Sequence, residues 1–217
     1  MDKIIACSTI KPEIEALDPA MECQFMEYGL HRTPDKLNNT LQEAIDESEE
    51  EGFRTIRLGY GLCSHGTSGL NAEKATLIIP RAHDCISILL GSAEDYMKEF
   101  KSSPGTIYLS RGWIEFEGDP LSEYKNYVEV VGEEMARETI EMEYRNYTRL
   151  VFINTWLADE KLEEYRERAR KIADFVNLEY MEEEGSPKLL KKLLAGKEDP
   201  ELGHFPPGRI ILRSNLV

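Results

Sequence analysis

Short apolar runs alternate with longer amphipathic stretches along the chain. Apolar runs of this length, bounded by turn residues, are typical of strands buried on both faces of a parallel sheet. We expect such strands at residues 3–7, 23–28, 55–58, 75–80, 106–109, 150–154, 178–181 and 209–212. Because strands alternate with helical segments, the pattern predicts an α/β protein with a mainly parallel sheet flanked by helices.

The stretches between these strands carry apolar residues at helical spacing. One predicted helix begins at Pro34, since proline suits the first helical position, and ends at Gly52. The spacing also predicts one long helix from about 121 to 147, a helix that begins at Asp159 and a last helix after Pro187.

A weak internal repeat bears on the domain organisation. The run Ile4-Ile-Ala-Cys-Ser, followed by a helix and a second strand, recurs as Val151-Phe-Ile-Asn-Thr with the same kind of sequel. Chance similarity between βαβ units and two related Rossmann-like halves are both open interpretations. We expect one α/β domain over residues 1–217, with two lobes of about 1–112 and 113–217 if the repeat is genuine.

The net charge of −15 limits the classes of partner that the protein is expected to bind. A nucleic-acid ligand needs a basic surface, so we expect none. No apolar run reaches the ~18 residues of a membrane span, and the first residues lack the apolar core of a signal peptide. We therefore expect a cytoplasmic protein with no membrane partner, whose four cysteines are reduced thiols, metal ligands or core residues.

Several predicted strands end in or are followed by cysteine or histidine, residue types that can bind a metal ion or take part in catalysis. Carboxyl ends of parallel strands meet at one edge of a sheet, where ligands of α/β proteins bind. The residues that follow such strand ends, and that we expect to converge, are Cys7, Cys63, His83 and Cys85. Cys23 lies near the start of its predicted strand and is expected at the opposite edge.

Thiolate and imidazole are ligands that zinc prefers, and thiolates also hold iron–sulfur clusters. The four residues therefore predict a metal site containing zinc or an iron–sulfur cluster. A metal-free nucleophile is a further possibility, because Cys85 lies beside His83 and near a helix start, which would lower its pKa. Cysteine at the end of a buried strand is also a common core residue.

A glycine-rich turn carries Cys63. Its glycines let the backbone approach a ligand closely, so we predict substrate binding at Gly61, His65 and Gly66. The turn is neither a dinucleotide fingerprint nor a P-loop, because the spacings differ and no Gly-Lys-Ser/Thr follows.

Two arginines at strand ends, Arg81 and Arg111, are candidates for holding a carboxylate or phosphate. Surface ion pairs are the alternative in so acidic a chain. We predict that Arg81 and the neighbouring Asp84 take part in catalysis if the protein is an enzyme.

Three segments of the chain stand out as motifs: Leu58-Gly-Tyr-Gly-Leu-Cys-Ser-His-Gly, Ile79-Pro-Arg-Ala-His-Asp-Cys-Ile-Ser-Ile-Leu-Leu-Gly-Ser and Pro104-Gly-Thr-Ile-Tyr-Leu-Ser-Arg-Gly-Trp-Ile-Glu. They resemble a family known only as a domain of unknown function, found in methanogenic archaea and anaerobic bacteria. Genes of this family often lie near corrinoid-dependent methyltransferases, which implies a link to one-carbon metabolism.

The tripeptide His83-Asp-Cys85 also resembles the His-x-Cys element with which zinc methylcobamide:thiol methyltransferases hold their metal. This resemblance implies zinc. The Asp-x-His-x-x-Gly motif of base-off corrinoid carriers is absent, so any cobamide is expected on a partner protein rather than bound directly.

The sequence therefore predicts a metal-binding protein of anaerobic one-carbon metabolism, whose partner is a small molecule or a corrinoid methyltransferase. If the protein is an enzyme, we expect a metal-dependent transferase in which the metal polarises a substrate thiol. Two alternatives stay open: a two-lobed small-molecule binding or sensory module without catalysis, and a metal-free cysteine-dependent enzyme.

Overall fold

The computed structural model describes residues 1–158 and 160–216, which divide into two compact units. Unit 1 comprises residues 1–96 and 186–216, and unit 2 comprises residues 97–185. Each unit has its own sheet, so the predicted α/β class with mainly parallel strands is confirmed. The units differ from the lobes expected from the sequence because the C-terminal segment returns to the first unit.

Sheet A of unit 1 has the strand order β2-β1-β3-β4-β8. Its strands are β1 (Asp2–Cys7), β2 (Glu22–Met26), β3 (Thr55–Gly59), β4 (Thr76–Pro80) and β8 (Leu202–Phe205). The first four are parallel, and β8 runs antiparallel to β4. The parallel strands place Cys7 and the turns that follow β3 and β4 at the same edge of the sheet.

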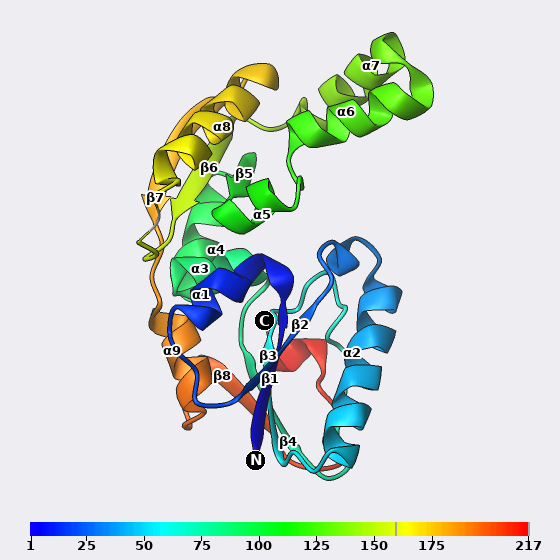
Figure 1. Ribbon diagram of the computed structural model, residues 1–217, viewed down its shortest axis with the longest axis vertical. Helices are drawn as coiled ribbons and strands as arrows, with labels where there is room; N and C mark the ends of the chain where they lie inside the picture. The colour runs from blue at the N-terminus through cyan, green and yellow to red at the C-terminus, as the bar shows by residue number, and fades with distance from the viewer. Residues whose placement is uncertain (159, 217) are drawn as a thin grey trace. The chain divides into compact units, whose positions relative to one another are not determined.

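Helices cover both faces of sheet A (Figure 1). Those of unit 1 are α1 (Lys11–Glu15), α2 (Pro34–Glu50), α3 (Cys85–Leu90) and α9 (Lys188–Ala195), with 3-10 turns at Ser8–Ile10, Leu30–Arg32 and Arg213–Asn215. On one face, Leu37 and Leu41 of α2 pack with Leu58 of β3 in a buried core. On the other, Arg57 of β3 donates its Nε to the carbonyl of Leu193 in α9 at 3.1 Å.

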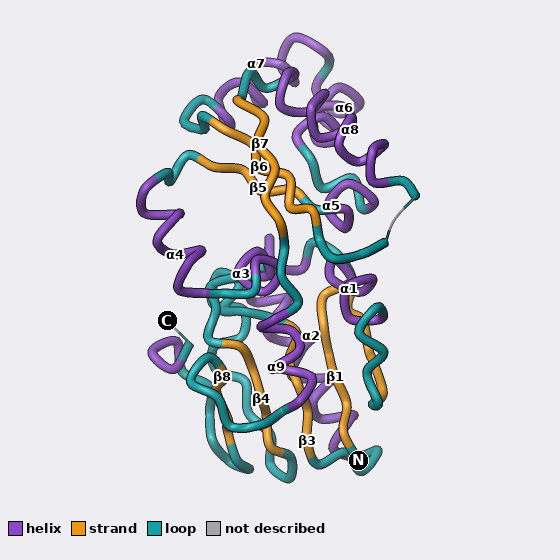
Figure 2. The backbone as a smooth tube through the Cα atoms, turned by 90° about the vertical axis from the view of Figure 1, so that its left-hand side faces the viewer, coloured by secondary structure: helices purple, strands orange, loops and turns teal. Residues whose placement is uncertain are grey.

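Sheet B of unit 2 is wholly parallel, with its three strands side by side in the order β5-β6-β7 (Figure 2). They are β5 (Thr106–Leu109), β6 (Arg149–Asn154) and β7 (Glu179–Glu184). The helices are α5 (Arg111–Glu115), α6 (Pro120–Val131), α7 (Glu133–Tyr144) and α8 (Leu162–Phe175), while α4 (Ala93–Ser102) runs from unit 1 into unit 2. Leu150 and Phe152 of β6 pack with Ile172 of α8.

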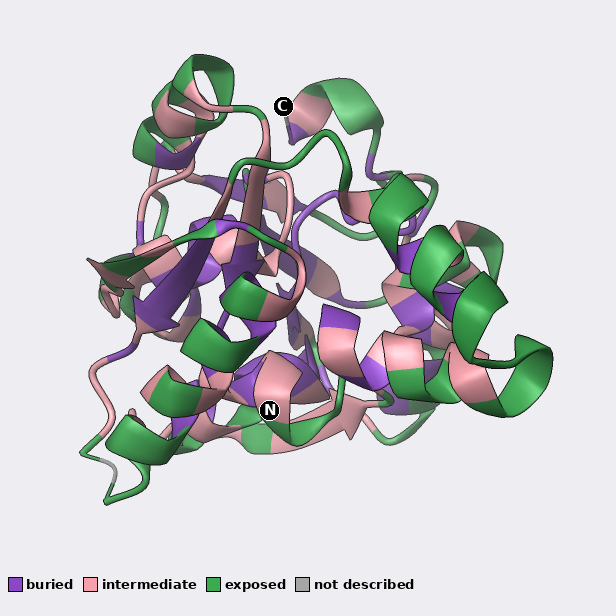
Figure 3. Cartoon of the chain, turned by 90° about the horizontal axis from the view of Figure 1, so that it is seen from above, coloured by how far each residue is buried: buried purple, intermediate pink, exposed green. Residues whose placement is uncertain are grey.

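Burial follows the sequence pattern in both units. Strands β1, β3, β4 and β6 are buried over almost their whole length, whereas α7 keeps most of its residues exposed (Figure 3). No helix in the described ranges has both the length and the apolar character needed to cross a membrane.

The single helix predicted from about 121 to 147 is wrong. Gly132 has φ 84° and ψ 167°, a conformation outside the helical region, and it separates α6 from α7. The amphipathic pattern continues on both sides of this residue because the two helices pack against each other. Periodicity therefore did not reveal the break.

The prediction of a closing strand at 209–212 is also wrong. The last strand of the described residues is β8, which begins seven residues before the predicted strand. Pro206, Pro207 and Gly208 (φ 76°) end β8, since proline cannot continue a ladder. Ile211 still exchanges backbone hydrogen bonds with Gly69 and Leu70, without forming a strand. His204 lies within β8.

One detail concerns the second βαβ unit. The helix predicted to begin at Asp159 is α8, which begins at Leu162, and Asp159 itself lies outside the described residues.

The opening strand of each βαβ unit is central in its sheet, with β1 between β2 and β3 and β6 between β5 and β7. A common origin for the two halves stays a prediction.

A buried carboxylate ties α2 to the start of β4. The side chain of Glu49, 7% exposed, accepts hydrogen bonds from the backbone N–H groups of Glu73, Lys74 and Ala75, at 3.1, 2.5 and 2.6 Å. These donors precede β4 and have no place in its ladder. Glu49 therefore supplies the hydrogen-bond acceptors for the backbone N–H groups of the turn that leads into β4.

We expect Glu49→Ala to lower the free energy of unfolding by about 3 kcal/mol, since it leaves these donors without their charged acceptor. The exposed neighbour Glu50 is the matched control, and Glu50→Ala should change the free energy by less than about 0.5 kcal/mol. Urea unfolding measures both. Equal effects of the two substitutions would contradict the assigned role of Glu49.

Candidate functional site

Three cysteines of unit 1 gather at the carboxyl edge of sheet A. Cys7 is the last residue of β1, Cys63 lies in the turn after β3, and Cys85 begins α3 after β4. All are free thiols; Cys7 and Cys63 are buried and Cys85 is partly buried. We call Cys7, Cys63 and Cys85 the thiol cluster, because each pair is close enough for one thiolate to affect the ionisation of the other.

Backbone pairing brings two of these segments together. Leu62 and Cys63 donate their N–H groups to the carbonyls of Ala82 and His83, each at 2.8 Å. At Gly61 the contact is closer still, since a Cβ there would lie 2.6 Å from both the Ala82 carbonyl oxygen and the Asp84 nitrogen. Only glycine fits at that position, so Gly61 has a structural reason to be there.

The turn that carries Cys63 is strained. Cys63, Ser64 and His65 have φ values of 44°, 55° and 77°, so three successive residues with side chains are left-handed. Such residues cost about 1 kcal/mol or more each and persist where the surrounding structure holds them. Here the hydroxyl of Thr67 donates to the carbonyl of Gly61 at 2.9 Å, and Asn38 of α2 donates to two carbonyls of the turn.

We expect Ser64→Gly and His65→Gly each to raise the free energy of unfolding by about 0.5–1 kcal/mol, because glycine adopts positive φ without steric cost. Ser68 lies in the same turn without a positive φ, so Ser68→Gly should instead destabilise by about 0.5–1 kcal/mol. Thermal or urea unfolding distinguishes the two signs. Destabilisation by all three substitutions would show that the turn is not strained.

Burial favours the neutral form of the Cys63 and Cys85 thiols, because it raises the pKa of each. Burial raises the pKa of Cys63 to about 12, and the nearby Asp84 and Cys7 act in the same direction. Burial also raises the pKa of Cys85, together with Cys63, Asp84 and Cys7. The sequence predicted a lowered pKa for Cys85, and this was wrong because burial and neighbouring negative groups outweigh the start of the short helix α3.

Two residues beside the cluster were not predicted from the sequence. The hydroxyl of Tyr60 is buried and has no hydrogen-bond partner among the described residues. Burial raises the pKa of Tyr60, and so do Cys7, Cys63 and Cys85, which places this hydroxyl near all three thiols. Thr9 lies next to Cys7, with its Oγ1 3.0 Å from the sulfur. The signal for Tyr60 was its position between two glycines, directly after a strand.

Asp84, predicted to be catalytic, caps helix α3. Its Oδ1 accepts from the backbone N–H groups of Ile86 and Ser87 at 3.1 and 3.2 Å, and its Oδ2 accepts from the hydroxyl of Tyr96 at 3.1 Å. His31 also lies near: burial and Arg32 lower its pKa, while Asp84 raises it. No local pattern in the sequence indicates the proximity of His31 to Asp84.

The remaining predicted residues lie apart or already have partners. Arg81 donates its Nε to the carbonyl of Leu202 at 3.2 Å and an Nη to that of Asn215. Arg111 belongs to unit 2 and forms an ion pair with Glu115 at 3.0 Å. Ligand-binding roles for these arginines stay predictions.

The other predicted members of the turn and of the metal site differ in exposure. His65 is exposed, whereas Gly66 is buried against Leu37 of α2, which a Cβ would approach to 2.5 Å. His83 is partly buried, and its carbonyl accepts from Cys63. Within the described residues, no three His, Cys, Asp or Glu side chains are arranged so that they could hold a metal ion.

One family model matches residues 25–194, most of the chain, and it describes a protein of unknown function, DUF1638. The chain belongs to the DUF1638 family. The matched range includes Cys63, His83 and Cys85 but not Cys7. No curated protein and no solved structure matches the chain. Family membership thus agrees with the resemblance to an uncharacterised family, and it assigns no activity.

The raised pKa values make a prediction about this DUF1638 protein. Because the thiolate is the reactive form, a pKa of about 12 means that alkylation of Cys63 keeps rising between pH 8 and pH 10. In urea, unfolding returns the pKa of Cys63 to near the ordinary thiol value of 9.0, so the alkylation rate should level off over the same pH range. Mass spectrometry after iodoacetamide treatment measures each cysteine. A native rate that levels off below pH 9 would contradict the raised pKa.

Proposed function

We propose that this protein binds a thiophilic metal ion or an iron–sulfur cluster through Cys7, Cys63 and Cys85. The observation that carries the proposal is the meeting of three free thiols from three separate strand ends, beside the unpartnered hydroxyl of Tyr60. Soft thiolate ligands select zinc, copper(I) or iron–sulfur centres.

Binding requires two changes in the thiol cluster. The side chains must rotate, since no three of them are arranged for coordination within the described ranges. The thiols must also lose their protons, because the raised pKa values of Cys63 and Cys85 keep them neutral. A divalent cation would favour the thiolates that burial disfavours. His83, whose backbone pairs with Cys63, is the nearest candidate for a fourth ligand in sequence.

The resemblance to a family encoded near corrinoid methyltransferases suggests the setting, which is one-carbon metabolism with a cobamide-carrying partner. A bound metal would supply Lewis-acid chemistry, by which a substrate thiol is converted to thiolate. Asp84 would keep its structural part in this proposal, since it fixes the start of α3 and hence the position of Cys85.

The neutral thiols make a metal-free cysteine enzyme the weaker alternative. Such an enzyme needs a thiolate near pH 7, whereas burial and neighbouring groups raise the pKa of both Cys63 and Cys85. Selective labelling of Cys85 at neutral pH would favour that alternative over the metal site.

The test is metal content and metal uptake of anaerobically purified protein. We expect zinc or iron in the purified protein, and thiolate-to-metal charge-transfer absorption when Co²⁺ is added to metal-free protein. Alanine at Cys7, Cys63 or Cys85 should weaken Co²⁺ binding by at least about 100-fold, because structural zinc sites of this kind bind with ~10–16 kcal/mol. Uptake should release protons and strengthen as the pH rises from 6 to 9, since the ligands bind as thiolates.

Cys23 provides the matched control, because it is a free thiol on β2, where it contacts the carbonyl of Met21. Cys23→Ala should bind Co²⁺ like the unmodified protein, and His83→Ala shows whether the imidazole is a ligand. Absence of zinc and iron, no charge-transfer band and unchanged stability of Cys63→Ala would together refute the proposal.

A further inference from the structure

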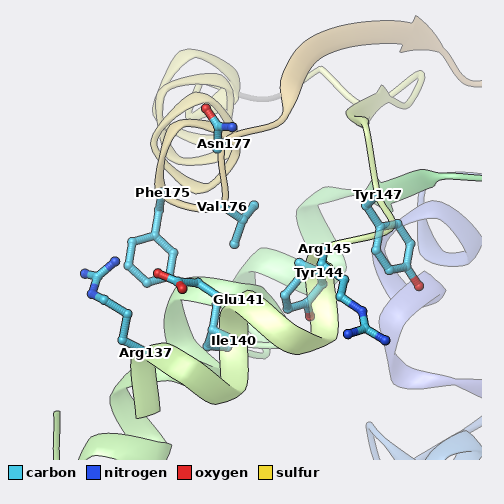
Figure 4. Close-up of a pocket in the computed structure, with 9 residues that line it drawn as sticks. All are labelled: Arg137, Ile140, Glu141, Tyr144, Arg145, Tyr147, Phe175, Val176 and Asn177. Carbon is cyan, nitrogen blue, oxygen red and sulfur yellow. The ribbon is translucent and has the colours of Figure 1, made fainter. Parts of the chain in front are cut away.

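We propose a second binding site, in unit 2, for a small planar aromatic compound that carries a carboxylate, sulfonate or phosphate group. The site is a cavity of about 310 Å³ between α7 and the end of α8 (Figure 4), which we call the α7–α8 pocket. Its walls include Arg137, Ile140, Tyr144, Arg145, Tyr147 and Phe175. This volume is in the range of small-molecule sites.

Aromatic rings form opposite sides of the α7–α8 pocket. Phe175 lies on one side and Tyr147 on the other (Figure 4). The rings of Tyr144 and Tyr147 are 5.6 Å apart, and the hydroxyl of Tyr144 is held by Glu123 at 2.7 Å. Ile140 is almost fully buried and belongs to the lining. Rings in these positions favour a flat, apolar ligand body.

The charge of the pocket points to an acidic substituent. The other arginines of unit 2 are each ion-paired, as Arg111–Glu115, Arg149–Glu99, Arg166–Glu182, Arg168–Asp119 and Arg170–Glu163. Arg137 and Arg145 have no ion pair with any described residue, although the chain carries a net charge of −15. Two guanidinium groups without an ion pair therefore line one cavity and can contact an external anion.

Arg137 is the principal anion contact. Its Cζ lies 5.5 Å from the ring centres of both Tyr124 and Phe175, which holds the planar group while leaving its N–H donors free. Arg145 is the C-cap of α7, where the partial negative charge of the helix end offsets part of its charge.

Glu141 opposes this site and so offers a test of it. It also lines the pocket and lies one helical turn from each arginine. A carboxylate there repels an anionic ligand and competes for the guanidinium groups. Removal of this carboxylate should therefore strengthen anion binding in the pocket. An anion bound to an unrelated face of the protein would not respond to this substitution.

The experiment uses 1-naphthalenesulfonate as the probe, observed by amide chemical shifts and titration calorimetry of the full chain. We expect shifts centred on residues 137–147 and 175–177. Arg137→Gln should weaken binding of the probe about tenfold, because it removes a charge-assisted hydrogen bond to the sulfonate. Glu141→Gln should strengthen binding severalfold, because it removes the carboxylate that repels the sulfonate. 1-Naphthylmethylamine, which has the ring and the opposite charge, and inorganic sulfate, which lacks the ring, should both bind at least tenfold more weakly.

Arg170→Gln is the matched control, since Arg170 is paired with Glu163 and stacked on Tyr180 rather than lining the pocket. It should leave the affinity for 1-naphthalenesulfonate unchanged. Equal binding of the cationic and anionic probes, equal loss in Arg137→Gln and Arg170→Gln, or no gain in Glu141→Gln would overturn the proposal.

Discussion

The close contact between residues 61–63 and 82–84 is the constraint on which the first unit depends. Two backbone hydrogen bonds of 2.8 Å join the segments beyond the ends of β3 and β4, and the absence of a side chain at Gly61 allows them to approach. This contact continues the pairing of the strands past the edge of the sheet. It fixes where Cys63 and the start of α3 lie, at the point where the chain enters the left-handed turn.

The thiol cluster follows from that contact. Cys85 stands at the start of α3, whose cap Asp84 is held by Tyr96, and Cys7 reaches the same edge because β1 is parallel to β3. Burial, together with nearby Asp84 and the other cysteines of the cluster, raises the pKa of Cys63 and Cys85, so the protein alone disfavours thiolates at these two positions. A positively charged ligand would reverse that balance, whereas a neutral one would leave it unchanged.

Much of the fold could be predicted because the apolar runs of the parallel strands are strong local signals. The limits of α2 followed from Pro34 and the glycine at its end. The break at Gly132 could not be predicted, since helical spacing continues through it, and β8 is too short and too poor in branched residues to be recognised.

The candidate site, like the fold, has parts that the sequence predicts and parts that it does not. The sheet topology brings Cys7, Cys63 and Cys85 to one edge, as parallel strands require. The two glycines that flank Tyr60 were a local signal for that residue, whereas the proximity of His31 to Asp84 depends on contacts between segments far apart in sequence and has no local signal. The α7–α8 pocket is of this kind too, because it needs the packing of two helices. The partners of Asp84 and Arg81 likewise became visible only in three dimensions.

The return of the C-terminal segment to sheet A has a consequence for synthesis on the ribosome. Unit 2 is one continuous stretch of chain, residues 97–185, and all of it emerges before β8 does. Sheet A, by contrast, begins with the first residues and gains its last strand only when residues 202–205 have been made. Until then one side of β4 offers unpaired backbone groups to other chains. The first unit to begin is therefore the last to be completed, against the usual order in which N-terminal domains finish first.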